Sequence, residues 1–127
     1  MSKPERNSTI LIVEDEKPLR QALVDKFTRE GFSILEAKDG EEGLRAAQDK
    51  HPALILLDII MPKMDGMTML QELRRDDAAG KIPVIILTNL TDAKAVEKAV
   101  GQGVYDFLVK SDWRLEEVVA KVKKKLG

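Results

Sequence analysis

Reactive side chains follow the short apolar runs of this 127-residue chain. They comprise three carboxylates, one hydroxyl and one ammonium: Glu14, Asp15, Asp58, Thr88 and Lys110. The run before Asp58 is short and uniformly apolar, which is typical of a strand buried on both faces of a parallel sheet. Because parallel strands all end at one edge, we expect these side chains at the same edge, where open α/β sheets bind ligands.

This set of residues suits the transfer of a phosphoryl group. Crowded carboxylates raise one another's pKa unless a cation shares the site. Because the chain has no cysteine and one histidine, oxygen ligands and a hard ion such as Mg²⁺ are expected. The carboxylate of Asp58 can act as a nucleophile and form an aspartyl phosphate, while Thr88 and Lys110 contact phosphoryl oxygens as a donor and a point charge.

The elements that position these residues alternate between strand and helix five times. Strands are expected at 9–13, 32–36, 54–58, 84–88 and 104–109. A helix is expected after each strand: the first ends before Gly31, the second covers 41–50, the third includes 69–73, the fourth runs from Asp92 to about 101, and the fifth covers 115–126. This order predicts a doubly wound α/β fold, (βα)5, which is a three-layer sandwich with a parallel sheet of flavodoxin-like strand order 2-1-3-4-5. Its first and third strands are neighbours, so Glu14, Asp15 and Asp58 should share one crevice.

The bulk composition predicts one soluble domain. Hydrophobic content of 43% with 34% charged residues is ordinary for a globular protein. The net charge of −1 does not indicate binding to nucleic acid, which is typical of strongly basic domains. Residues 1–8 lack the apolar core of a signal peptide, and no run approaches the roughly 20 apolar residues of a membrane helix. We therefore expect a tail at 1–8 and one domain at 9–127, in the cytoplasm, with neither membrane nor direct nucleic-acid binding.

Together with Met61-Pro62 and Asp65-Gly66, these residues resemble the receiver domain of two-component response regulators, including CheY-like single-domain receivers. The resemblance spans about Thr9 to Leu126, in matching order and spacing. It implies that a histidine kinase or a histidine phosphotransfer protein phosphorylates Asp58. For Mg²⁺ it implies Asp15 as a direct ligand, Glu14 acting through a bound water, and the backbone carbonyl of Ile60.

The resemblance also implies how the signal leaves the domain. Thr88 and Phe107 occupy the switch positions, where the hydroxyl moves toward the phosphoryl group and the aromatic ring rotates inward. The output surface for a downstream protein is then the helix from Asp92 to about 101, the strand 104–109 and the helix 115–126. The sequence leaves open whether phosphorylation also produces a homodimer through this surface. Since the sequence ends with the last helix, we expect no output domain in it; it acts on partners in trans or is an excised part of a longer protein.

Several residues depart from the usual family pattern. Ser111 follows Lys110 where a proline in a cis bond is usual, and a non-proline cis bond costs about 3 kcal/mol, so we expect a trans bond and a reshaped loop. Asn89 follows Thr88 where a small residue is typical. The resemblance implies that the side chains of Ile60 and Leu90 flank the water that attacks the phosphoryl group. Because apolar side chains cannot orient that water, we predict slow self-dephosphorylation, which a half-life of seconds would contradict.

Two other functions compete with the receiver. A pseudo-receiver would be a docking module that takes no phosphate, a possibility that Ser111 keeps open. An aspartyl phosphatase of the haloacid-dehalogenase type would need Asp-x-Asp at the nucleophile, but Ile60 occupies the second position and the short chain offers no capping insertion. We expect the receiver, a phosphoacceptor that assists its own phosphorylation and is not otherwise an enzyme. Taken singly, Asp58 would be a strand-end cap, Lys110 a surface lysine and Phe107 a core residue.

Overall fold

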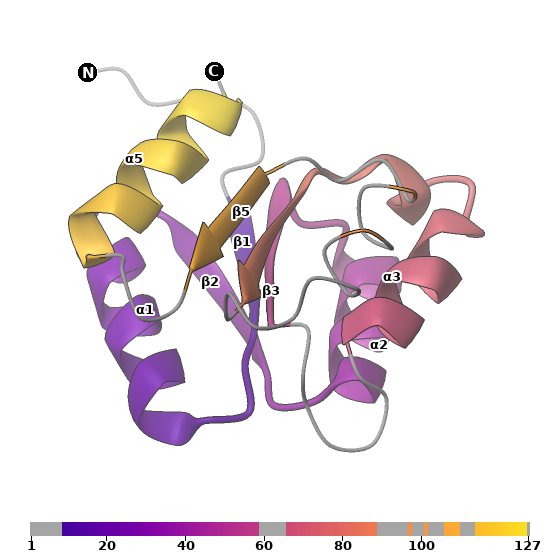
Figure 1. Cartoon of the computed structure of the whole chain (residues 1–127), viewed down its shortest axis with the longest axis horizontal. Coiled ribbons are helices and arrows are strands. Elements are labelled where there is room, and N and C mark those ends of the chain that lie inside the picture. Colours follow the sequence, from indigo (N-terminus) through magenta and orange to yellow (C-terminus); the bar gives the residue numbers. More distant parts are fainter. Residues whose placement is uncertain are drawn as a thin grey trace.

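Five parallel strands form a single sheet in the computed structural model of the chain (Figure 1). The structure describes residues 9–58, 66–88, 106–109 and 114–126 with Glu97 and Gly101, and gives only the backbone of Thr88, Asp106, Phe107 and Val109. The strands are β1 (Thr9–Val13), β2 (Ser33–Ala37), β3 (Leu54–Asp58), β4 (Val84–Thr88) and β5 (Asp106–Val109). They pair in the order β2-β1-β3-β4-β5, which confirms the predicted sheet.

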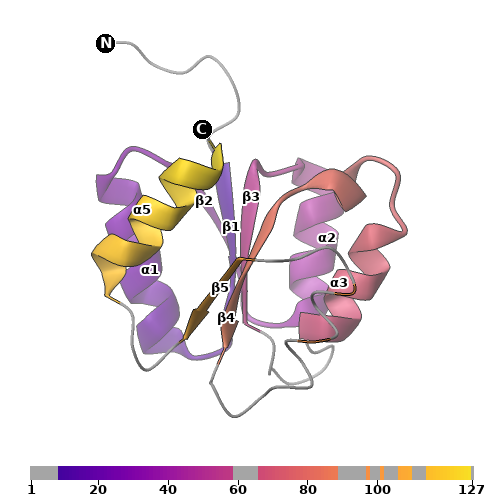
Figure 2. The ribbon, with the colours of Figure 1, turned by 45° about the horizontal axis from the view of Figure 1, so that its top comes forward.

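Helices cover both faces of this sheet. They are α1 (Lys17–Arg29), α2 (Gly40–Lys50), α3 (Gly66–Arg74) and α5 (Leu115–Leu126), with a short 3-10 helix, η1 (Ala79–Lys81). Figure 2 shows the sheet nearly edge-on, with α1 and α5 on one side and α2 and α3 on the other, so the predicted three layers are confirmed. The expected tail at 1–8 lies outside the described residues, as does most of the expected fourth helix, of which Glu97 and Gly101 are helical. No helix in the described ranges is long and apolar enough to cross a membrane.

Alternate residues of each strand fill two separate cores. The α2/α3 core takes Leu11, Val13, Ile55 and Leu57 from β1 and β3. The α1/α5 core takes Ile10, Ile12, Leu54 and Leu56 from the same strands. All eight side chains are fully buried. Both faces of the strands are therefore covered, which is why their sequences are uniformly apolar rather than alternating.

The end of α1 fixes where β2 begins. Gly31, with φ of 96°, donates its N–H to the carbonyl of Thr28 at 3.1 Å, and Phe32 donates to the carbonyl of Phe27 at 3.0 Å. These two bonds form the Schellman motif that closes a helix at a left-handed glycine. The rings of Phe27 and Phe32 meet edge to face, 5.5 Å apart. Phe32 thus belongs to the helix end, and the predicted strand 32–36 is wrong by one residue, since β2 runs from Ser33 to Ala37.

A side-chain cap begins α2. Oδ1 of Asp39 accepts the N–H of Glu42 at 2.9 Å, and Oε1 of Glu42 accepts the N–H of Lys38 at 3.0 Å. This pair resembles a capping box, in which two backbone donors at a helix start are satisfied by side chains. The helix therefore starts at Gly40, one residue earlier than predicted.

Candidate functional site

Three carboxylates meet where β1 and β3 end. Val13 pairs with Leu57 in the register of these adjacent strands, so the residues that follow, Glu14 and Asp58, lie side by side. Oxygen atoms of Glu14, Asp15 and Asp58 all lie within 4.8 Å of one another. The structure thus brings together the three carboxylates that the strand order placed in one crevice.

Two of these carboxylates are withdrawn from solvent. Glu14 is 0% exposed and Asp58 is 4% exposed, whereas Asp15 is more accessible. A buried carboxylate loses its hydration, so its charged form depends on nearby donors or a cation. The cluster therefore consists of two buried carboxylates and one that is more accessible to solvent.

The turn between β1 and α1 is held by hydrogen bonds that backbone N–H groups donate. The N–H of Glu14 donates to the carbonyl of Ala37 in β2 at 3.0 Å, so the chain stays in the sheet beyond β1. Oε2 of Glu14 accepts the N–H of Glu16 at 3.1 Å. Glu16 is the N-cap residue of α1, yet its own side chain makes no capping bond, and Pro18 occupies the first turn. The turn presents Glu14 and Asp15 to the crevice and leaves Glu16 outside it, as expected.

The donor set fits a hard divalent cation. Mg²⁺ binds oxygen ligands at about 2.0–2.1 Å in octahedral geometry, so neighbouring and opposite ligands of one ion lie roughly 3–4 Å apart. The carboxylate oxygens in the crevice lie close to this range, and a ligand that falls short is reached through a bound water. Glu14, Asp15 and Asp58 are therefore the residues that would hold Mg²⁺.

The other predicted site residues are described only in part. Leu87 pairs with Asp58, so the backbone of Thr88 lies one residue beyond Asp58 in the neighbouring strand. Thr88 pairs in turn with Val109, the residue before Lys110, and Phe107 pairs with Ile86. The side chains of Thr88 and Phe107 lie outside the described part, as do Ile60, Asn89, Leu90, Lys110 and Ser111. The sheet register thus agrees with the expected edge, and the roles of these side chains stay predictions.

Sequence reasoning missed two charged residues beside the crevice. Arg20 of α1 donates from Nη1 to the backbone carbonyl of Glu14 at 2.9 Å and from Nε to Oε1 of Glu36 at 3.1 Å. Glu36 lies in β2, sixteen residues along the chain. The signal available was a glutamate that follows the apolar pair Ile34 and Leu35 in this strand, but nothing in the periodicity identified its partner.

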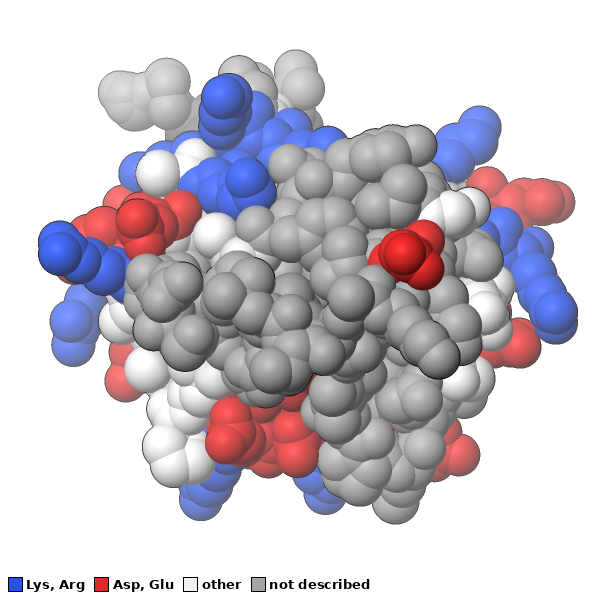
Figure 3. Space-filling view, viewed as in Figure 1, with Lys and Arg blue, Asp and Glu red and all other residues white. Residues whose placement is uncertain are grey.

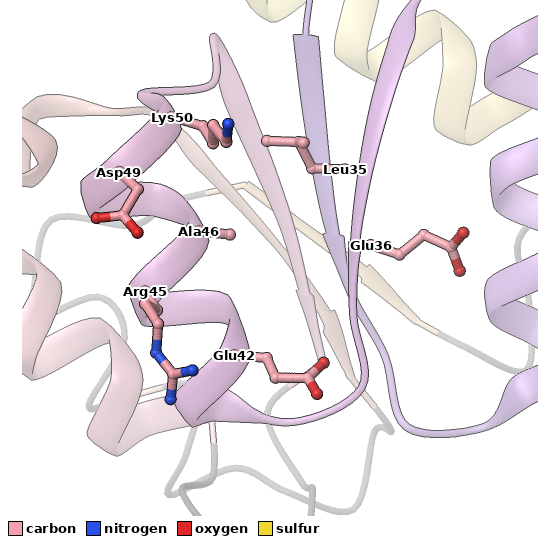
Figure 4. A pocket seen from close by; sticks show the side chains of 7 residues that line it. All are labelled: Leu35, Glu36, Glu42, Arg45, Ala46, Asp49 and Lys50. Atoms are coloured by element: carbon pink, nitrogen blue, oxygen red, sulfur yellow. The ribbon is translucent and has the colours of Figure 1, made fainter.

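A shallow hollow lies away from the carboxylates. It measures about 270 Å³ between β2 and α2 and is lined by Leu35, Glu36, Glu42, Arg45, Ala46, Asp49 and Lys50 (Figure 4). Basic side chains gather elsewhere, over α5 at the upper left of Figure 3, where the last turn carries Lys123, Lys124 and Lys125. Neither feature includes Glu14, Asp15 or Asp58, so we assign neither to the site.

Comparison with known proteins identifies the class of this domain. The family model for the response regulator receiver domain matches residues 10–123. Since this match covers nearly the whole chain, the protein belongs to the response regulator receiver domain family.

Relatives of the chain occur in longer proteins of more than one kind. A probable transcriptional regulator ycf27 of Cyanophora paradoxa is 40% identical over 101 residues, which cover 80% of this chain and 41% of the relative. Histidine kinase P4 of Formosa agariphila is 43% identical over 82 residues, covering 65% of this chain and 6% of the kinase. The crystal structure of a signal receiver domain of a histidine kinase from Syntrophus aciditrophicus superposes with a TM-score of 0.84 at 31% identity, covering 94% of this chain and 89% of that chain. The chain thus spans less than half the length of both curated relatives.

Proposed function

We propose that this receiver domain accepts a phosphoryl group on Asp58 from a histidine kinase or a histidine phosphotransfer protein, with Mg²⁺ in the crevice. The observation that carries the proposal is the convergence of Glu14, Asp15 and Asp58 at the ends of adjacent strands. Membership of the receiver family supports it. The domain acts as a phosphoacceptor in signalling and not as an enzyme with a separate substrate.

The transfer is a single displacement at phosphorus. A carboxylate oxygen of Asp58 attacks the phosphorus of a phosphohistidine, and the new P–O bond forms as the P–N bond breaks. The imidazole leaves with the electron pair and takes up a proton, while Asp58 becomes an acyl phosphate. When bound, Mg²⁺ neutralises negative charge on the phosphoryl oxygens and on the carboxylates.

The protein's own contribution is the position and the burial of these side chains. Asp58 is 4% exposed, so electrostatic interactions around it are screened less than in bulk water. Glu14 and Asp15 hold carboxylate oxygens within 4.8 Å of those of Asp58. Thr88 and Lys110 are proposed to contact the phosphoryl oxygens as a hydroxyl donor and an ammonium.

The signal is proposed to leave through the face that includes β5 and α5. Phosphorylation would bias two arrangements of this face through Thr88 and Phe107, as a local charge change biases a bistable element. The partner is a downstream protein or, as the open alternative, a second copy of the chain. The domain is proposed to work in the cytoplasm without itself contacting membrane or nucleic acid. Its net charge of −1 gives no support for binding to nucleic acid.

Intact mass tests this proposal most simply. The protein is incubated with Mg²⁺ and acetyl phosphate, in parallel with Asp58→Asn and with Asp39→Asn as the matched control. Asp39 is a second buried aspartate that caps α2, and asparagine caps helices equally well. We expect one hydroxylamine-labile phosphoryl group on the parent and on Asp39→Asn, and none on Asp58→Asn.

The remaining outcomes separate the alternatives. No adduct at saturating Mg²⁺ would contradict the proposal and favour the docking module. Continuous release of phosphate over many turnovers would favour a phosphatase. A slowly decaying adduct would agree with the prediction made from Ile60 and Leu90.

A further inference from the structure

Arg20 joins the anionic crevice to the edge strand of the sheet. Its guanidinium donates to the carbonyl of Glu14 at 2.9 Å and to Oε1 of Glu36 at 3.1 Å, and its side chain is only 14% exposed. The same Glu36 oxygen accepts a hydrogen bond from Nε2 of Gln21 at 3.3 Å. Figure 4 shows Glu36 pointing away from α2 and the hollow, toward the side of the sheet where α1 lies.

The carbonyl that Arg20 contacts is well placed for control of the crevice. It belongs to the peptide that links Glu14 to Asp15, two of the three clustered carboxylates. A displacement of this peptide would move both side chains relative to Asp58. Because guanidinium is planar and carries several donors in fixed directions, one arginine can hold a carbonyl and a carboxylate at once.

The charge of Arg20 is balanced away from the crevice. In the described part of the chain its guanidinium bonds end on a backbone oxygen and on Glu36, which is itself partly exposed in β2. An arginine bonded directly to Asp15 or Asp58 would compete with a metal ion for the same oxygens. With Glu36 as its counter-ion, Arg20 fixes the turn and leaves those oxygens for the cation.

We infer that Arg20 is a positioning residue for the divalent cation and that Glu36 keeps it in place. The inference rests on the proposed function, since it concerns the ion held by the same crevice. Partners that orient metal ligands without binding the metal typically contribute about 10–100-fold to metal affinity. We therefore expect Arg20→Met to weaken Mg²⁺ binding about 10-fold or more, and Glu36→Gln to weaken it less.

The test measures the thermal unfolding midpoint of the parent and of each variant, first in chelator and then at increasing Mg²⁺ concentrations up to saturation. A ligand that binds only the folded state raises this midpoint by an amount that depends on its dissociation constant, so affinity and metal-free stability come from one experiment. Arg29→Met is the matched control, because it removes an exposed arginine from the last turn of the same helix. We expect unchanged Mg²⁺ affinity in Arg29→Met, and an affinity between those of the parent and Arg20→Met in Arg20→Lys, whose single ammonium cannot hold both oxygens in the same way.

Hydrogen exchange gives a second readout that needs no metal. In the presence of chelator, the backbone amides of Asp15 and Glu16 should exchange faster in Arg20→Met than in the parent. The exchange rates of the amides in β3 should be the same in both proteins. A lower unfolding midpoint with the same Mg²⁺ affinity and the same local exchange would overturn the inference, because Arg20 would then be merely structural. If Arg20→Met does not fold, Arg20→Lys and Glu36→Gln decide the question by the same criteria.

The outcome also separates this inference from the proposed function. Asp15→Asn serves as the reference for a damaged metal site. If the parent shows no Mg²⁺-dependent stabilisation, both the proposed function and the inference fail. If the parent is stabilised, Asp15→Asn is not, and Arg20→Met responds as the parent does, only the inference fails.

Discussion

The two faces of the sheet are held together in different ways. On the α2/α3 face, Gly43 of α2 packs so closely that a Cβ atom there would lie 2.9 Å from Cγ2 of Val13 and 3.0 Å from Sδ of Met69. On the α1/α5 face, ion pairs join the helices over the core: Lys123 contacts Glu30 at 2.9 Å, and Lys26 contacts Glu116 at 4.0 Å. One face thus relies on close steric fit, and the other adds charge at its surface.

This difference matches the tasks of the two faces. Val13 immediately precedes Glu14, so the tight packing under α2 fixes the strand end that presents the crevice. Exposed ion pairs typically contribute about 0–1 kcal/mol and weaken with salt, so these pairs add little to the buried contacts between α1 and α5. The closely packed α2/α3 face supports the site, and the α1/α5 face carries a helix of the proposed output surface.

The core beneath the ion pairs should produce the largest effect. Phe27 of α1 is 0% exposed and packs against Phe32. Phe27→Ala is expected to lower the free energy of unfolding by about 3–5 kcal/mol, through lost burial and the cavity left behind. Urea unfolding measures the change, with the milder Phe27→Leu as the control. A loss below about 1 kcal/mol would mean that the α1/α5 face does not depend on a packed core.

Gly43 tests the steric fit of the opposite face. Gly43→Ala should lower the free energy of unfolding by about 1–3 kcal/mol, the usual cost of overpacking, since Val13 is buried and β-branched. Gly101 is the control, because it is helical and a Cβ atom there would meet nothing within 4 Å. Gly101→Ala should stabilise the protein by up to about 1 kcal/mol. Equal effects of the two substitutions in urea unfolding would refute the close fit.

The cap at the start of α2 should make the next largest contribution to the stability of the α2/α3 face. Asp39→Ala removes the oxygen that accepts the N–H of Glu42 and should lower the free energy of unfolding by about 0.5–2 kcal/mol. Asp39→Asn should retain most of the stability, because an amide oxygen also caps. If both variants lose the same amount in urea unfolding, the carboxylate charge and not the cap would be responsible.

The ion pairs between α1 and α5 should give the smallest effect, and that effect should depend on pH. The hydrogen bond from Lys123 lowers the pKa of Glu30 below its ordinary value of 4.5. A lowered folded-state pKa stabilises the protein above the unfolded pKa, and this stabilisation is lost as the pH falls through the folded value. Glu30→Gln should therefore be slightly less stable than the parent at pH 7 and should converge with it in acid.

The control for this substitution is Asp25→Asn, which removes an exposed carboxylate from the same helix. Thermal unfolding across pH and salt compares the variants. A stability difference between Glu30→Gln and the parent that persists in acid or at high salt would show that packing, not charge, joins α1 to α5.

Features that depend on neighbouring residues in the sequence were predictable, and side-chain contacts between residues distant in the sequence were not. Apolar runs located β1, β3 and β4, and strand order then brought Asp58 together with Glu14 and Asp15. The pairing of Arg20 with Glu36 was missed because periodicity reports which face a residue occupies and not which side chain it meets.

The connection after α3 shows the same limit. Nη1 of Arg74 donates to the carbonyls of Gly80 at 2.6 Å and Ile82 at 3.2 Å, while Asp76 accepts the N–H groups of Ala78 and Ala79. These bonds shape η1, which the sequence pattern does not predict. A turn stabilised by side chains from a neighbouring helix leaves no apolar pattern in the sequence.

The position of the phosphoryl group on the protein tests the role of Asp58 most directly. After incubation with acetyl phosphate, the protein is reduced with borohydride, which converts an aspartyl phosphate to homoserine, and the modified residue is located by peptide mass spectrometry. We predict modification at Asp58 in the presence of Mg²⁺ and none in chelator. Modification at another residue, or equal modification with and without Mg²⁺, would contradict the assignment of the crevice as a metal-assisted phosphoacceptor site.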